Sequence, residues 1–357
     1  MSAPHQQRTS LTAILRLGAI CLFAAMLLGG GFSVHAQSVN GKNVLSVHSA
    51  ALELNPGLPD DRQLGRLQYL GGLILASDDS RFGGYSGLGM DADGAGLWAI
   101  SDRGHWLRLD FSLAPDGIPA AVKAAAIRPL LGPDGKILDG LQQADSEGLR
   151  LDQAGGAWVS FERRHRLLYY PDGPTGTQPP VPIPLPPDVA RLPANGGLES
   201  VAIMAPGRGP DADLLLLAEE PLHGESGVSP LWLRRGGQWQ RYSWPLEGAF
   251  RPTDAIALPG GTLGQDKTIL VLERDFRWLS GWAARLSRVS LTDSLLKPGA
   301  LLKPERLAEW ARPYANDNLE AMDIRIGTDG TPWLYLMSDD NQSRSQRTLL
   351  LVFRLAI

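Results

Sequence analysis

Short apolar runs rich in Val, Ile, Leu, Trp and Tyr recur along the chain between clusters of Gly, Pro and Asp. Long stretches with apolar residues at helical spacing are scarce. This pattern is typical of an all-β protein, in which each run forms a strand and each cluster a turn. The pairs Asp93-Gly94, Asp134-Gly135 and Asp329-Gly330 are signals for tight hairpin turns.

One hairpin pattern occurs five times. Residues 145–165, DSEGLRLDQAGGAWVSFERRH, predict two strands that begin at Glu147 and end at Glu162-Arg163. Four other segments follow the same plan, beginning at Ser86, Glu199, Asp254 and Glu320 and ending at Asp102-Arg103, Glu219-Glu220, Glu273-Arg274 and Asp339-Asp340. Hydrophobic patterning gives no reason for these acids, so their recurrence indicates a genuine repeat.

The five first residues, which we call the entrance positions, are separated by 61, 52, 55 and 66 residues. A period of this length with several short strands per unit is typical of a β-propeller with four-stranded blades. The residues before Ser86 and after Glu320 together exceed one period. We therefore predict a six-bladed propeller with one degenerate blade, with five blades as the alternative. A strand within residues 44–54 is predicted to close the last blade.

The Pro-rich segment 171–193 resembles a linker, since proline cannot donate to a strand ladder. The same repeat occurs on both sides of it, however. We therefore interpret this segment as the outer edge and loop of one blade, and residues 37–357 as a single domain.

The first 36 residues have the order of a secretory signal: Arg8 and Arg16, an apolar run from Leu17 to Phe32, and small residues near Ala36. The run is short for a membrane span, which needs roughly 20 residues. The single cysteine, Cys21, lies inside this segment, so no disulfide would support the mature fold. We expect a periplasmic or secreted protein.

A hairpin brings the first residue of one strand close to the last residue of the next, and each first strand of a propeller blade lines the central channel. The acids should therefore gather at one channel mouth, where their repulsion requires compensation. Clusters of carboxylate oxygens are typical of Ca²⁺ sites, whereas no zinc motif occurs. The predicted metal ligands are Glu147, Glu199, Asp254, Glu320, Asp102, Glu162, Glu219, Glu273 and Asp339.

Arginines directly follow several of these acids in the sequence. Because neighbouring residues on a strand point to opposite faces, an acid and the arginine next to it are poorly placed to form an ion pair. The arginines would thus be available to an anionic ester that is attacked by water activated by the metal. Two histidines at matching positions could relay protons. The predicted catalytic residues are Arg103, Arg163, Arg274, His105 and His165. A formal charge of −4 gives no reason to expect a nucleic-acid partner. We expect a monomer that acts on a small anionic ester. After cleavage of the signal, we expect no stable association with a membrane.

The SGL and SDRG segments at 86–88 and 101–104, DSEGL at 145–149, and the later LES and LEA segments resemble the phytase-like family of secreted bacterial proteins. The resemblance covers about residues 65–354. It implies a β-propeller with esterase-like activity, and propeller phytases use Ca²⁺ at an acidic channel mouth. Ser86 departs from the rule of an acid at each entrance position, and the phytase ligand set cannot be matched residue by residue.

Two other functions remain open. One is a lactonase or carboxylesterase, since propellers similar to gluconolactonases hold a divalent ion on channel acids. The other is a binding or scaffold propeller without catalysis, for which RWLSGW (277–282) and QWQRYSW (238–244) could form a partner face. We expect these aromatics to pack between blades instead. A serine hydrolase is disfavoured because no GxSxG motif occurs.

Overall fold

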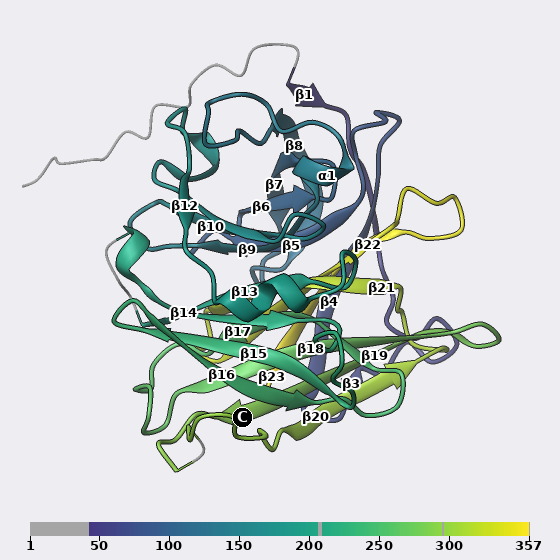
Figure 1. Cartoon of the computed structure of the whole chain (residues 1–357). Helices are drawn as coiled ribbons and strands as arrows, with labels where there is room; N and C mark the ends of the chain where they lie inside the picture. The colour runs from purple at the N-terminus through teal and green to yellow at the C-terminus, as the bar shows by residue number, and fades with distance from the viewer. Residues whose placement is uncertain (1–42, 206–208, 295, 357) are drawn as a thin grey trace, which may run out of the picture. The chain divides into compact units, whose positions relative to one another are not determined.

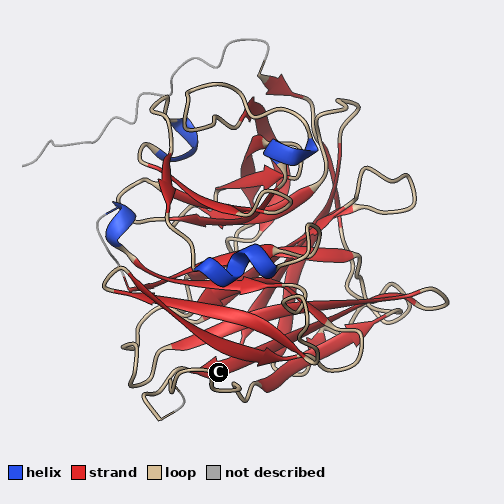
Figure 2. Cartoon of the chain, viewed as in Figure 1, coloured by secondary structure: helices blue, strands red, loops and turns tan. Residues whose placement is uncertain are grey.

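Strands make up most of the computed structural model, which describes residues 43–205, 209–294 and 296–356 (Figure 2). Within these ranges the helices are short: α1 (Leu141–Ala144) and the 3₁₀ turns Gly173–Thr175, Pro187–Arg191 and Gly209–Asp211. The predicted all-β class is confirmed. No helix in the described part of the chain has the length and apolar character needed to cross a bilayer. The predicted signal, residues 1–36, lies outside the described residues.

Four antiparallel sheets are each built from consecutive strands (Figure 1). The first contains β5 (Tyr85–Met90), β6 (Gly96–Ser101), β7 (His105–Leu113) and β8 (Pro119–Pro129), with β1 (Val44–Leu45) outside β8. The second contains β9 (Ser146–Leu151), β10 (Ala157–Phe161), β11 (Arg166–Tyr170) and β12 (Val181–Ile183). Since β12 lies within the Pro-rich segment and pairs with β11, that segment does form an outer blade edge.

The third sheet contains β13 (Leu198–Ala205), β14 (Asp213–Ala218), β15 (Val228–Arg235) and β16 (Gln238–Pro245). The fourth contains β17 (Arg251–Ala257), β18 (Thr268–Arg277), β19 (Gly281–Ser290) and β20 (Glu305–Ala311). Each sheet therefore follows the up-and-down order expected of a propeller blade.

The fifth sheet joins the two ends of the domain. It contains β21 (Asn318–Ile326), β22 (Pro332–Asp339) and β23 (Thr348–Leu355), followed by β4 (Leu67–Ala76), β2 (His48–Ala51) and the short β3 (Gln63–Leu64). An N-terminal strand thus closes the last blade, as predicted, but the strand beside β23 is β4. The segment 44–54 instead supplies β1 to the first blade and β2 to the outer edge of the fifth.

The innermost strands form a closed ring. β5 contacts β9, β9 contacts β13, β13 contacts β17, β17 contacts β21, and β21 contacts β5. The protein is therefore a five-bladed β-propeller, the alternative blade count. The sixth blade that the spacing favoured is not formed by the described residues, because the N-terminal segment extends the first and last blades instead of building a sheet of its own.

Five apolar clusters fill the spaces between adjacent blades. Trp106 and Phe161, for example, belong to a cluster shared by the first two blades. The inner strands are buried on both faces, and β10 (AWVSF) is buried at every position. This explains why such strands are continuous apolar runs: neither face of the sheet meets water.

Closure by β4 should make the ring one cooperative unit. Leu73 of β4 is 1% exposed and pairs with Leu350, whereas Leu58, in a loop, is 63% exposed. We expect Leu73→Ala to lower the free energy of unfolding by about 2–5 kcal/mol, and the matched control Leu58→Ala to change it by less than about 0.5 kcal/mol. Denaturant unfolding followed by tryptophan fluorescence measures both; equal losses would contradict a packed closing strand.

Candidate functional site

A bulge interrupts the pairing of the innermost strand with its neighbour at the same place in every blade. A bulge sets two residues of one strand opposite one of the partner and redirects a side chain, which is common at the rims of β-structures. Aligned on these bulges, the equivalent residues are Ser86, Glu147, Glu199, Thr253 and Glu320. On each second strand, we call the residue after the partner of the last residue before the bulge the exit position; these residues are Asp102, Glu162, Glu219, Arg274 and Asp339.

The fourth blade differs from the expected alignment by one residue. Its bulge lies between Pro252 and Asp254, so Thr253 occupies the entrance position, and Arg274 takes the exit position that we expected for Glu273. A shift of one residue turns a strand side chain to the opposite face. Asp254 and Glu273 therefore do not join the other acids, and their predicted place at the mouth is corrected.

Three buried carboxylates lie together beside the second blade. Oxygens of Asp145, Glu147 and Glu162 are within 4.8 Å of one another. Asp145 lies between α1 and β9, and Glu162 accepts hydrogen bonds from the Gly196 and Gly197 N–H groups at 2.7 and 3.2 Å. Asp145 was missed in the sequence analysis, although it lies two residues before Glu147 in the segment DSEGL. This buried acidic cluster could bind a metal ion.

The remaining mouth acids extend this cluster. Burial, and then repulsion from Glu199, raises the pKa of Glu147 well above its usual value. Burial also raises the pKa of both Asp102 and Glu162 to about 7. Burial is also the largest cause of the raised pKa values of the other mouth acids, which are Asp145, Glu199, Glu219, Glu320 and Asp339.

Arg274 partly compensates this negative charge. Its guanidinium forms ion pairs with Glu219 at 3.2 Å and with Glu320 at 3.1 Å, and these neighbours raise its pKa despite burial. Arg163, which has a positive φ of 52°, pairs with Asp145 and lies only 4.0 Å from Glu162. Two of the three predicted arginines are thus engaged with acids at the mouth.

The third arginine and the two histidines make fewer contacts with the mouth. Arg103 is exposed, and no ion pair involves it among the described residues. His165 bonds to the Pro193 carbonyl at 3.0 Å and packs so closely against Gly197 that a Cβ there would lie 2.2 Å from its ring. Burial, and then Arg81 and Arg103, lower the pKa of His105. Their roles in catalysis stay predictions.

Asp254 has a different partner inside the channel. Arg150 of β9 reaches it at 2.6 Å, and both side chains are buried. Asp254 also accepts the Met322 N–H at 2.8 Å, so the pair links the second, fourth and fifth blades. Arg150 and Asp323 also line a cavity of about 1050 Å³ at the opposite ends of the innermost strands.

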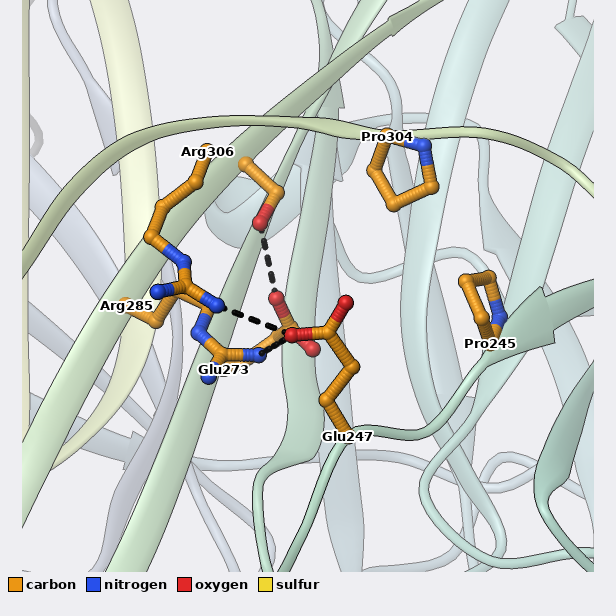
Figure 3. A pocket seen from close by; sticks show the side chains of 7 residues that line it. Pro245, Glu247, Glu273, Arg285, Pro304 and Arg306 are labelled. Atoms are coloured by element: carbon orange, nitrogen blue, oxygen red, sulfur yellow. Dashed lines mark hydrogen bonds and ion pairs between the residues drawn. The ribbon is translucent and has the colours of Figure 1, made fainter.

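Glu273 faces the gap between the third and fourth blades. It accepts hydrogen bonds from Ser287 at 2.9 Å and from the Trp244 indole at 3.4 Å. It lines a cavity of about 190 Å³ beside Arg285 and Glu247, which are ion-paired at 3.2 Å (Figure 3). These contacts join blades and leave Glu273 without a place in the acidic cluster.

Comparison with known proteins agrees with this geometry. Residues 80–342, well over half of the chain, match the phytase-like family, described as esterase-like activity of phytase. The chain belongs to the phytase-like family. Membership supports an esterase-like, hydrolytic role for this phytase-like propeller. No curated protein is similar enough to count as a match.

Two solved structures are distantly similar to the phytase-like chain. A virginiamycin B lyase from Staphylococcus aureus is 12% identical, with 86% of this chain and 100% of that chain covered and a TM-score of 0.38. The catalytic domain of an α-L-arabinofuranosidase from Coprinopsis cinerea is 12% identical, with 81% and 97% covered and a TM-score of 0.46. Likenesses at these scores support no conclusion about activity.

The channel pair gives one prediction. Asp254→Asn should lower the free energy of unfolding by about 3–5 kcal/mol, because it leaves the Arg150 charge buried without its partner. The double variant Arg150→Met with Asp254→Asn should lose less than the sum of the two single losses. Urea unfolding of the four proteins in this cycle measures the coupling, and strictly additive losses would contradict the ion pair.

The acids of the mouth give a second prediction. Each has a higher pKa in the folded than in the unfolded chain, so the folded state binds more protons and loses stability as pH rises. With a chelator present, the melting temperature should therefore fall as the pH increases from about 4 through the values near 7 of Asp102 and Glu162. Thermal unfolding across this pH range measures it; a melting temperature that rises steadily instead would contradict convergence of the acids.

Proposed function

We propose that this phytase-like propeller is an exported, metal-dependent hydrolase of small anionic esters, with phosphoric esters preferred to carboxylic esters and Ca²⁺ as the metal. The observation that carries the proposal is the triad of buried carboxylates Asp145, Glu147 and Glu162. Three carboxylates held this closely repel one another when ionised, and Arg163 is the described side chain that forms ion pairs with them. A bound cation would stabilise their charged forms further. The leader-like residues 1–36 and the family membership support export and ester hydrolysis.

The donor set fits a hard cation. All donors are oxygens, and Ca²⁺ takes six to eight oxygen ligands. Asp145, Glu147 and Glu162 would hold the ion, with Glu199 close enough to Glu147 to raise its pKa by repulsion. Arg163 and the Gly196 and Gly197 N–H groups fix the orientation of Asp145 and Glu162. When bound, the ion would supply Lewis-acid activation of water and of the ester oxygen.

The cationic side chains of the mouth would orient the substrate. Arg274 is fixed between Glu219 and Glu320 on the side of the mouth formed by the third to fifth blades. Arg103 is exposed beside Asp102 and is free to bind a phosphate or carboxylate oxygen. Asp102, with a pKa near 7, could hold or release a proton near neutral pH.

The decisive experiment offers the purified mature protein a phosphomonoester, a lactone and a carboxyl ester, each with Ca²⁺ and with a chelator. We expect release of phosphate that depends on Ca²⁺. Turnover of the lactone or the carboxyl ester alone would replace the phosphoesterase with the alternative hydrolase. A folded protein that turns over none of the three would leave a binding propeller.

Substitution of Glu147 tests the metal directly. Glu147→Gln keeps the side-chain shape but removes one charge, and we expect Ca²⁺ affinity to fall on the order of 10- to 100-fold or more, as loss of groups around a metal does. Isothermal titration measures it, with circular dichroism to confirm folding. Asp293→Asn is the matched control, because Asp293 is 77% exposed and lies outside the cluster. Equal affinities of Glu147→Gln and the wild type would refute the metal assignment.

A further inference from the structure

The hairpin of β18 and β19 continues outward past the mouth (Figure 1). Arg274 occupies the exit position of the fourth blade, and the two strands remain paired beyond it as far as Arg277 and Gly281. The corresponding second strands of the first three blades end before their exit positions, at Ser101, Phe161 and Ala218. The fourth blade is thus distinguished from these by a paired extension that begins at the acidic cluster.

One face of this extension is aromatic. Side chains two residues apart lie on the same face of a strand, so Phe276 follows Arg274 on that face. Phe276 is directly opposite Trp282 of β19, and their ring centroids are 4.8 Å apart. The Arg274 guanidinium lies 5.4 Å from the Trp282 ring centroid. The face therefore runs without interruption from Glu320 and Glu219 through Arg274 to the two rings.

The outer part of the extension lacks apolar cover. Phe276 is 57% exposed, and Trp278 and Leu279 at the tip are 87% and 89% exposed. Large apolar side chains grouped on the surface are typical of binding and interaction sites. In contrast, Trp244 of the other Trp-rich segment is fully buried, which confirms packing between blades for that residue.

We propose that the Phe276–Trp282 face is the subsite for a planar aromatic group on the ester. This inference rests on the proposed function, since it names the substrate class of the same mouth. The occupant follows from continuity with the site: an anionic group near Arg274 would place an attached ring beside Trp282 and Phe276. Offset or edge-on contact between rings adds to the burial of apolar area and favours an aromatic group over a short alkyl group.

Binding of phenylphosphonate and methylphosphonate to the full mature chain tests the subsite, because neither probe is an ester that can be hydrolysed. Titration calorimetry in Ca²⁺ should show tighter binding of the phenyl probe. Phe276→Ala should weaken phenylphosphonate binding by about 2- to 12-fold and leave methylphosphonate binding unchanged. Phe276→Tyr, which keeps the ring, should restore the preference.

Ile326→Ala is the matched control, since Ile326 is 48% exposed at the other end of β21 and should leave both affinities unchanged. Equal weakening of both probes by Phe276→Ala would overturn the subsite. A dimer that Trp278→Ala dissociates, with no ring preference in the wild type, would assign the extension to contact between copies and also overturn it. A ring preference lost in Phe276→Ala without any ester turnover would support the subsite while the proposed hydrolase fails.

Discussion

Repulsion among buried carboxylates at one channel mouth is the constraint on which this structure depends. A closed ring of five inner strands repeats the same bulged position around its axis, and acids at three of those positions face acids at four exit positions. Their pKa values rise because burial penalises the charged forms. The fold therefore creates an electrostatic cost that a cation must offset, whether it belongs to a side chain or to a bound metal ion.

The fourth blade supplies part of that compensation, in addition to Arg163 of the second blade. Thr253 replaces an acid at the entrance position and donates to the Leu319 carbonyl at 3.0 Å, while Arg274 replaces an acid at the exit position. The mouth is consequently asymmetric. Asp145, Glu147 and Glu162 form an anionic side suited to a metal ion, and Arg274 leads to the aromatic extension on the other side. Deeper in the channel, the ion pair between Arg150 and Asp254 connects the second and fourth blades.

Much of the architecture followed from local patterns. Five apolar hairpins, four of them with acids at both ends, indicated the propeller. They also identified most acids of the mouth, because period and polarity are properties of the chain itself. The blade count was harder. Residues 44–76 carry ordinary strand signals, and only pairing with β8 and β23 shows that they extend existing blades. Asp145 was missed because it lies before β9 and not at the end of a predicted strand. The backbone between α1 and β9 brings its carboxylate close to those of Glu147 and Glu162.

By itself the sequence determined the repeat, the all-β class and which hairpin ends carry acids. Only the tertiary structure decided where each acid points. Asp254 and Glu273 matched the pattern as well as Glu199 and Glu219 did, yet a bulge placed one residue earlier turned them away and brought Arg274 to the mouth. The physical reason is the two-residue period of a strand, in which a bulge set by pairing with the neighbouring strand reverses the faces of the residues beyond it.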